Sequence, residues 1–366
     1  MKVDRTIKLR LRLNEIDEPK LKETIMMYNK AVNIAANYGF EHHTSSKIII
    51  HHATYYSIRE QFPELNSSLV QAARDVAAEA LKGVKLKILP VAKPLAAARF
   101  NQRTLRVVLK HMFATMSTIA GRIEATYTIP EYYSKYLNWS VQSSTIKYIQ
   151  QKNEFWLHLV MRTESPKQSG NKVLGIDRGI VNVAVCSNNK FFNGFQIKAV
   201  RAKYAYIRQK LQSKGTKSAK QLLKKISGKE RRFVKDVNHC ISKEIVAMPY
   251  NVFALEDLTS IRVQTRRGKN FTRKLNNWSF YQLEQFIRYK AEAVGKLVIT
   301  VDPRFSSQKC SRCGNILKEN RNGNAYRCHN CGLQLHADLN AARNIAQSGT
   351  SCLSRLPVNQ PNVVSI

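Results

Sequence analysis

Four cysteines form two Cys-x-x-Cys-Gly motifs, and this spacing limits what the surrounding chain can fold into. Cys310 and Cys313 form one pair and Cys328 and Cys331 the other, with fourteen residues between the inner cysteines. Each pair suits a tight turn followed by glycine, and four thiolates are the ligands that tetrahedral Zn²⁺ prefers. A redox site is the alternative, but redox Cys-x-x-Cys pairs come singly at a helix start. We therefore expect one structural Zn²⁺ in a zinc ribbon.

The chain carries far more basic than acidic side chains. Its 366 residues include 60 Lys and Arg against 25 Asp and Glu, a formal net charge of +35. This excess opposes folding by self-repulsion unless a polyanion neutralises it, and nucleic acid is the first candidate. No stretch approaches ~18 uninterrupted apolar residues, so we expect no membrane-spanning helix. The first residues lack the apolar core of a signal peptide, and the cysteine usage favours a reducing compartment.

The basic charge is concentrated in particular segments. The stretch 198–247 reads as a helix broken near 213–216, and its part 198–235 holds fourteen Lys and Arg and a single acid, Glu230. Residues 2–13 alternate basic and apolar side chains, as a half-buried strand with one basic face does. The loop 265–270 is predicted to clamp a nucleic-acid backbone, with a solvated loop as the alternative. The residues expected to contact nucleic acid are Lys2, Arg10, Arg12, Lys203, Arg208, Lys210, Lys224, Lys225, Arg231, Arg232, Arg266 and Arg267.

The periodicity of the apolar residues changes along the chain and predicts several domains. Residues 1–15 and 95–170 read as short strands of an antiparallel β-barrel, interrupted by helices over 16–94. Thr44 or Ser45 is expected to cap the second of these helices and Ser67 the third. An α/β pattern follows over 171–304 and 333–347, with the zinc ribbon at 305–332 between its parts. Residues 348–366 lack periodicity and are expected to form a flexible tail.

Carboxylates interrupt the apolar segments of the α/β region. Asp177 lies in the apolar strand VLGIDRG, Glu256 and Asp257 end the strand VFALEDL, and Asp338 begins the helix DLNAARNI. A charge in such a strand is costly unless it is paired or bound to a metal. Two strand-borne acids and one at a helix start could meet at a sheet edge and bind Mg²⁺ for phosphodiester hydrolysis. Strand alternation allows only one of Glu256 and Asp257 in this cluster. Asp338 could also be a helix N-cap, a role that is compatible with metal binding.

Together these segments resemble the TnpB family of insertion-sequence proteins, relatives of the type V CRISPR nucleases. The resemblance is dense over 171–347, through GIDRG, FALEDL, WSFYQLEQFIRYKAEAVG, VDPRFSSQKCSRCG and HADLNAARNIAQ, and is architectural over 1–170. It implies an α/β fold, with an RNase H-like RuvC nuclease domain and an inserted zinc ribbon. It also implies an N-terminal wedge-type β-barrel interrupted by a helical recognition insertion. His336-Ala337 stands where many relatives carry a charged pair.

The resemblance also implies a function. Asp177, Glu256 and Asp338 would be the catalytic triad, with two Mg²⁺ or Mn²⁺ ions, and Glu256 rather than Asp257 would be its glutamate. The partners would be a guide RNA from the element's end and double-stranded DNA beside a short recognised motif, in a prokaryotic cytoplasm at the nucleoid. The expected activity is RNA-guided DNA cleavage. The alternatives are an RNA-guided repressor that does not cleave and a strand-transfer transposase that needs no guide.

Overall fold

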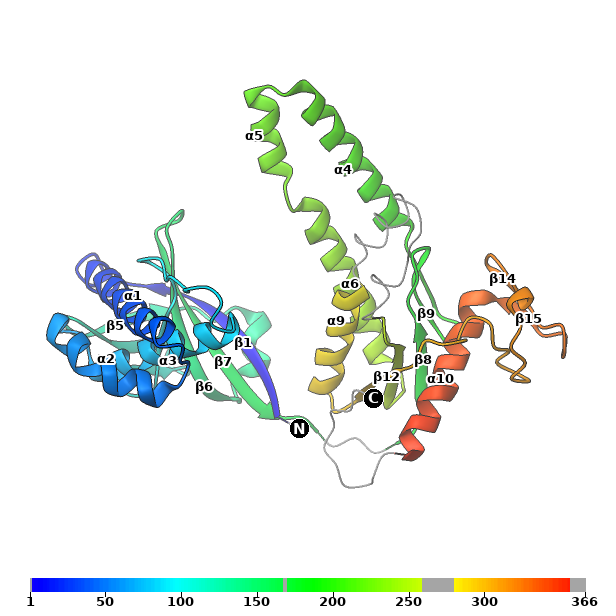
Figure 1. Cartoon of the computed structure of the whole chain (residues 1–366), viewed down its shortest axis with the longest axis horizontal. Coiled ribbons are helices and arrows are strands. Elements are labelled where there is room, and N and C mark those ends of the chain that lie inside the picture. The colour runs from blue at the N-terminus through cyan, green and yellow to red at the C-terminus, as the bar shows by residue number, and fades with distance from the viewer. Residues whose placement is uncertain (1, 167–169, 259–279, 356–366) are drawn as a thin grey trace. The chain divides into compact units, whose positions relative to one another are not determined.

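The computed structural model describes residues 2–166, 170–258 and 280–355. The chain divides into two compact units, one over Lys2–Glu164 and one from Ser165 onward, and each is described by itself (Figure 1). The loop 265–270 lies outside the described residues, as do the last eleven residues. Among the described helices, none is long and apolar enough to cross a membrane.

The first unit is built on a seven-stranded antiparallel sheet that is nearly closed into a barrel. Strand β1 pairs with β7 along nearly its whole length, and β2 and β3 lie at the two edges although only residues 101–104 separate them. The strand order is β2 (Ala98–Phe100), β6 (Ser140–Ile149), β7 (Glu154–Glu164), β1 (Lys2–Arg12), β5 (Gly121–Tyr127), β4 (Phe113–Thr118) and β3 (Leu105–Val108).

Strand β1 confirms the predicted alternation. Its apolar residues Val3, Ile7, Leu9 and Leu11 are buried. The basic residues Lys2, Arg10 and Arg12 are exposed on the opposite face.

Three helices lie between β1 and β2 in the chain, as the sequence predicts: α1 (Asp17–Glu41), α2 (Lys47–Gln61) and α3 (Ser67–Gly83). The predicted caps are wrong by one or two residues. Ser46 is the N-cap of α2 and makes no side-chain cap, and Asn66 caps α3 by accepting a hydrogen bond from the Ser68 amide. Asn and Ser cap helices about equally well, so adjacent candidates are not separated by residue type.

The second unit contains a five-stranded mixed sheet. Strands β8, β11 and β12 are parallel, whereas β9 and β10 are antiparallel to their neighbours. The order is β10 (Phe191–Asn193), β9 (Asn182–Cys186), β8 (Val173–Asp177), β11 (Val252–Glu256) and β12 (Leu297–Val301). A separate three-stranded sheet forms the cysteine-rich segment, with β13 (Arg321–Asn322), β14 (Ala325–Arg327) and β15 (Gln334–His336).

The basic segment is a hairpin of three helices that projects from this sheet (Figure 1). They are α4 (Phe195–Lys214), α5 (Lys217–Ile226) and α6 (Lys229–Ala247). The predicted break near 213–216 is confirmed, and a second break at 227–228 was not predicted. Gly228 there has a φ of 76°, a conformation that only glycine adopts at no cost. Helix α9 (Phe280–Ala293) packs against α6 (Figure 1).

The last described helix, α10 (Ala337–Arg355), lies directly on the sheet. A Cβ at Gly175 of β8 would lie 2.0 Å from the Ala342 carbonyl oxygen, and one at Gly349 would lie 2.6 Å from the Ala254 Cβ. The expected flexible tail is therefore wrong as far as Arg355. Its Ser, Gly and Thr residues show no apolar period because the helix packs through small residues. This packing fixes the start of α10 beside the ends of β8 and β11.

Candidate active site

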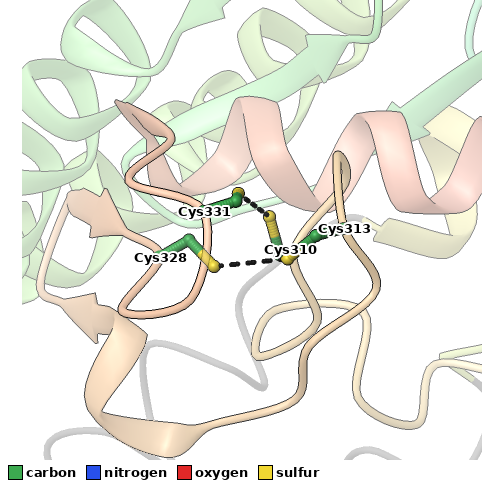
Figure 2. Close-up of side chains that lie close together, drawn as sticks. All are labelled: Cys310, Cys313, Cys328 and Cys331. Carbon is green, nitrogen blue, oxygen red and sulfur yellow. Dashed lines mark hydrogen bonds between the residues drawn. The ribbon is translucent and has the colours of Figure 1, made fainter.

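The four cysteines of the paired motifs converge at one point (Figure 2). Cys310 Sγ lies 3.6 Å from Cys331 Sγ, and Cys313 Sγ lies 3.5 Å from Cys328 Sγ. Tetrahedral zinc with Zn–S bonds of 2.3 Å places its sulfurs about 3.8 Å apart, so the donor set and spacing are compatible with a structural zinc ion. In the part of the chain that the structure describes, no other group of three or more His, Cys, Asp or Glu ligands lies as close.

The surroundings of Cys313 stabilise its thiolate, whereas desolvation and the neighbouring cysteines raise the pKa of Cys331 to about 11. The glycines after each pair, Gly314 and Gly332, have φ of 77° and 69°, which explains why each motif ends in glycine. The Asn315 amide and then the Asn330 side chain donate to Cys313 and lower its pKa to about 6. Hydrogen bonds that stabilise a thiolate also orient it toward a metal.

The three predicted carboxylates meet at one edge of the five-stranded sheet. Asp177 and Glu256 end the parallel neighbours β8 and β11, whose register pairs Ile176 with Leu255. Asp338 lies in the first turn of α10, which packs on β8. Burial raises the pKa of Asp177 well above its usual value, and the negative charges of Glu256 and Asp338 raise it further. The structure thus brings Asp177 next to both other carboxylates.

Of the two neighbouring acids, Glu256 is the one that faces this edge. Its side chain is 9% exposed and burial raises its pKa, while a hydrogen bond from the Ser306 side chain acts in the opposite direction. Asp257 follows the strand, and its backbone amide donates to the Val301 carbonyl oxygen. The burial of Glu256 and the position of Asp257 after the strand therefore favour Glu256 as the member of the cluster.

Asp338 is held by side chains rather than acting as a cap. Its oxygens accept hydrogen bonds from Asn182 Nδ2 at 3.0 Å and from Arg321 Nη2 at 3.2 Å. The residue before the helix, His336, accepts the Asp338 backbone N–H at Nδ1. The N-cap interpretation of Asp338 is therefore wrong, because His336 caps the helix and leaves the carboxylate facing Asp177.

Two arginines that the sequence did not single out contact the site. Arg178 is almost fully buried and donates to Glu284 of α9 at 2.9 Å and to the Glu256 carbonyl oxygen. Its position directly after Asp177 in an apolar segment was an available signal. Arg321 reaches Asp338 from the cysteine-rich segment, and nothing in the sequence marks it, because only the folding of that segment brings it there.

The residues predicted to bind nucleic acid are mostly exposed. Arg208 pairs with Glu230, the single acid of residues 198–235, at 2.8 Å, and Arg10 pairs with Glu154 at 3.3 Å. Arg266 and Arg267 lie outside the described residues. The exposed members are Lys2, Arg10, Arg12, Lys203, Arg208, Lys210, Lys224, Lys225, Arg231 and Arg232.

Two family models match this chain, and most of the residues that they match lie in the second unit. Residues 157–263 match the family model described as a probable transposase, OrfB_IS605, and residues 280–345 match the Cas12f1-like TNB domain. A TnpB-like protein of Methanocaldococcus jannaschii is 37% identical over 41% of this chain and 56% of its own length. The CRISPR-associated endodeoxyribonuclease Cas12f1 of Sulfoacidibacillus thermotolerans is 34% identical over 57% of this chain and 53% of its own. The chain thus spans about half the length of these relatives.

A solved structure shows the fold over most of the chain. The cryo-EM structure of a Cas12f1–sgRNA–target DNA complex matches 94% of this chain and 99% of that chain, with a TM-score of 0.67 at 14% identity. The predicted α/β fold class is confirmed by this match together with the nearly closed sheet and the cysteine cluster. The chain is therefore similar to TnpB-like proteins and to Cas12f1 in its sequence, and to Cas12f1 in its fold.

Proposed function

We propose that this chain is an RNA-guided DNA endonuclease of the insertion-sequence transposase type. The observation that carries the proposal is the meeting of Asp177, Glu256 and Asp338 at one sheet edge, where burial and mutual repulsion raise the pKa of Asp177. A bound cation would stabilise these carboxylates, because their negative charges lie close together at a partly buried site. Carboxylate oxygens suit Mg²⁺ or Mn²⁺.

Asp177, Glu256 and Asp338 would hold a pair of divalent ions. Asp177 interacts electrostatically with both other carboxylates, and their oxygens are the ligands that such ions prefer. Such a pair activates water and stabilises the leaving oxygen of a phosphodiester.

The protein's own groups position this chemistry. Arg178 ties the end of β8 to β11 and α9, so the two strand-borne carboxylates keep their spacing. Asn182 and Arg321 orient Asp338 from two sides. The guanidinium of Arg321, which contacts Asp338, suits a phosphate oxygen as well as a carboxylate.

Guide RNA and double-stranded DNA are the partners that the charge and the relatives support. Fourteen basic residues over 198–235 suit the binding of phosphates. The relatives come from a bacterium and an archaeon, and we place the activity in the cytoplasm of such a cell, at its DNA.

The test of the guided activity is to express the gene with its native flanking DNA, purify the protein and sequence the RNA that remains bound. We expect a discrete RNA that maps to the gene's 3′ side and extends into the neighbouring sequence. A smear of cellular RNA would contradict guidance and favour the unguided transposase. A discrete RNA without cleavage of a matched target in Mg²⁺ would favour the repressor.

A further inference from the structure

The seam of the barrel in the first unit forms a large cavity that is open to solvent. Strands β2 and β3 each pair with one neighbour only, so the nearly closed sheet stays open between them. The cavity at this opening has a volume of about 1090 Å³, at the upper end of the ~300–1,000 Å³ of small-molecule pockets. It is lined by residues of β2, β3, β4, β5 and β6, by the loop between β2 and β3, and by Gln71 of α3.

Four arginines line this cavity and no acidic side chain does: Arg99, Arg103, Arg106 and Arg122. Arg99 is neutralised by Glu79, with a shortest N–O distance of 2.7 Å. The other three are exposed, and no ion pair to any of them is found in the described residues. Three unneutralised guanidinium groups around one hollow repel each other unless an anion binds between them.

The remaining lining residues offer both donors and acceptors. Asn101, Gln102, Gln142 and Ser143 reach the cavity from the loop between β2 and β3 and from β6. The register of β6 against β7 shifts between Val141 and Ser143, and this irregularity presents Gln142. The loop is held in place because the Asn101 side chain accepts the backbone N–H groups of Arg103 and Thr104.

We propose that this seam cavity binds an unpaired segment of RNA, with Arg103, Arg106 and Arg122 on its phosphates. A hollow suits a protruding single strand, whereas a duplex is read by elements that enter its grooves. Amide and hydroxyl groups beside the arginines can contact base edges and the 2′-hydroxyl, which distinguishes RNA from DNA. The inference rests on the proposed function only in that RNA is a partner of the chain.

The salt dependence of RNA binding tests the proposal. We would titrate the full-length protein with a labelled single-stranded RNA of about 16 nucleotides and with a DNA duplex of the same sequence. Each phosphate contact to a single strand adds about 0.7 to the slope of log affinity against log salt, so Arg106→Ala/Arg122→Ala should lower the RNA slope by about 1.4. The duplex slope should stay unchanged.

Two matched variants control for net charge and for folding. Lys30→Ala/Lys152→Ala removes the same charge from exposed positions of the same unit outside the cavity and should leave both slopes unchanged. Arg106→Lys/Arg122→Lys keeps the charge and should retain the RNA slope. Cross-linking with 4-thiouridine RNA should label peptides that contain residues 99–107 or 141–144.

Two results would overturn the inference. An unchanged RNA slope in the alanine variant would show that the arginines do not contact RNA. An equal fall in the duplex slope would show a surface that takes any polyanion. Neither bears on the nuclease, because binding is measured without cleavage and the proposed function fails only if the guided protein does not cut.

Discussion

At the scale of single residues, the proposed activity depends on Glu256 rather than its neighbour Asp257 as a metal ligand. Glu256 ends β11 beside Asp177 and is buried, whereas Asp257 follows the strand. We expect Glu256→Gln to weaken Mn²⁺ binding about 10–100-fold or more, because it removes a charged donor. Asp257→Asn, the matched control, should change it little. Calorimetric titration with Mn²⁺ checks this, and the opposite order of the two variants would exclude Glu256.

The charge on Asp177 should destabilise the metal-free protein at neutral pH. Its pKa is raised in the folded state above the ordinary value of 3.8. The folded state therefore holds the proton more tightly, and this contribution to stability is full below the unfolded pKa and lost as the pH rises through the folded pKa. Asp177→Asn should raise the melting temperature without metal near neutral pH, and the gain should disappear at about pH 4. A lower melting temperature at neutral pH would show that the carboxylate is stabilised as an ion.

Arg178 should contribute strongly to the stability of the second unit. Its side chain is 1% exposed and bridges Glu284 and the end of β11. Arg178→Met leaves the Glu284 carboxylate and the Glu256 carbonyl oxygen buried without this donor, although Arg288 still contacts Glu284. The substitution should destabilise the protein by about 3–5 kcal/mol. Arg304→Met, which removes an 81% exposed arginine bridged to Asp302, should cost less than about 1 kcal/mol. Urea denaturation measures both, and equal costs would contradict the structural role of Arg178.

At the scale of elements, the contact of α10 with the sheet determines where Asp338 lies. Gly175→Ala would place a methyl group 2.0 Å from the Ala342 carbonyl oxygen, so the helix must move away from β8. We expect a clear loss of stability and weaker Mn²⁺ binding. Gly83→Ala, at the end of α3, meets nothing within 4 Å and should be neutral or slightly stabilising. Unchanged Mn²⁺ binding in Gly175→Ala would show that Asp338 does not depend on this contact.

Sequence patterns predicted the elements that bury one face and missed those that depend on distant contacts. The alternation of Val3, Ile7 and Leu9 revealed β1, and the glycine after each cysteine pair revealed the turns around the cluster. The end of α10 was missed because Gly349 packs through its lack of a side chain. The helix caps were missed by one or two residues because neighbouring Ser, Thr and Asn are all good caps.

Sequence patterns likewise revealed some residues of the candidate active site and missed those that only the folded chain brings together. The three carboxylates were visible as charges that interrupt apolar segments. Strand alternation allowed only one of Glu256 and Asp257 in the cluster, and the family resemblance indicated Glu256. The contact of Arg321 with Asp338 joins the ribbon to α10, so no local pattern contains it. The arginines of the seam cavity are scattered over three strands and a loop, and only barrel closure brings them together.

At the scale of the whole molecule, the central claim is that a guide directs this chain's carboxylates to cut DNA. The most direct measurement is cleavage of a plasmid that carries the sequence matched by the bound RNA, in Mg²⁺, beside a plasmid with that sequence scrambled. We predict a cut in the matched plasmid only, its loss with EDTA, and a fall of about 10²–10³-fold or more in Asp177→Ala. Cutting of both plasmids alike, or full activity in Asp177→Ala, would contradict the claim.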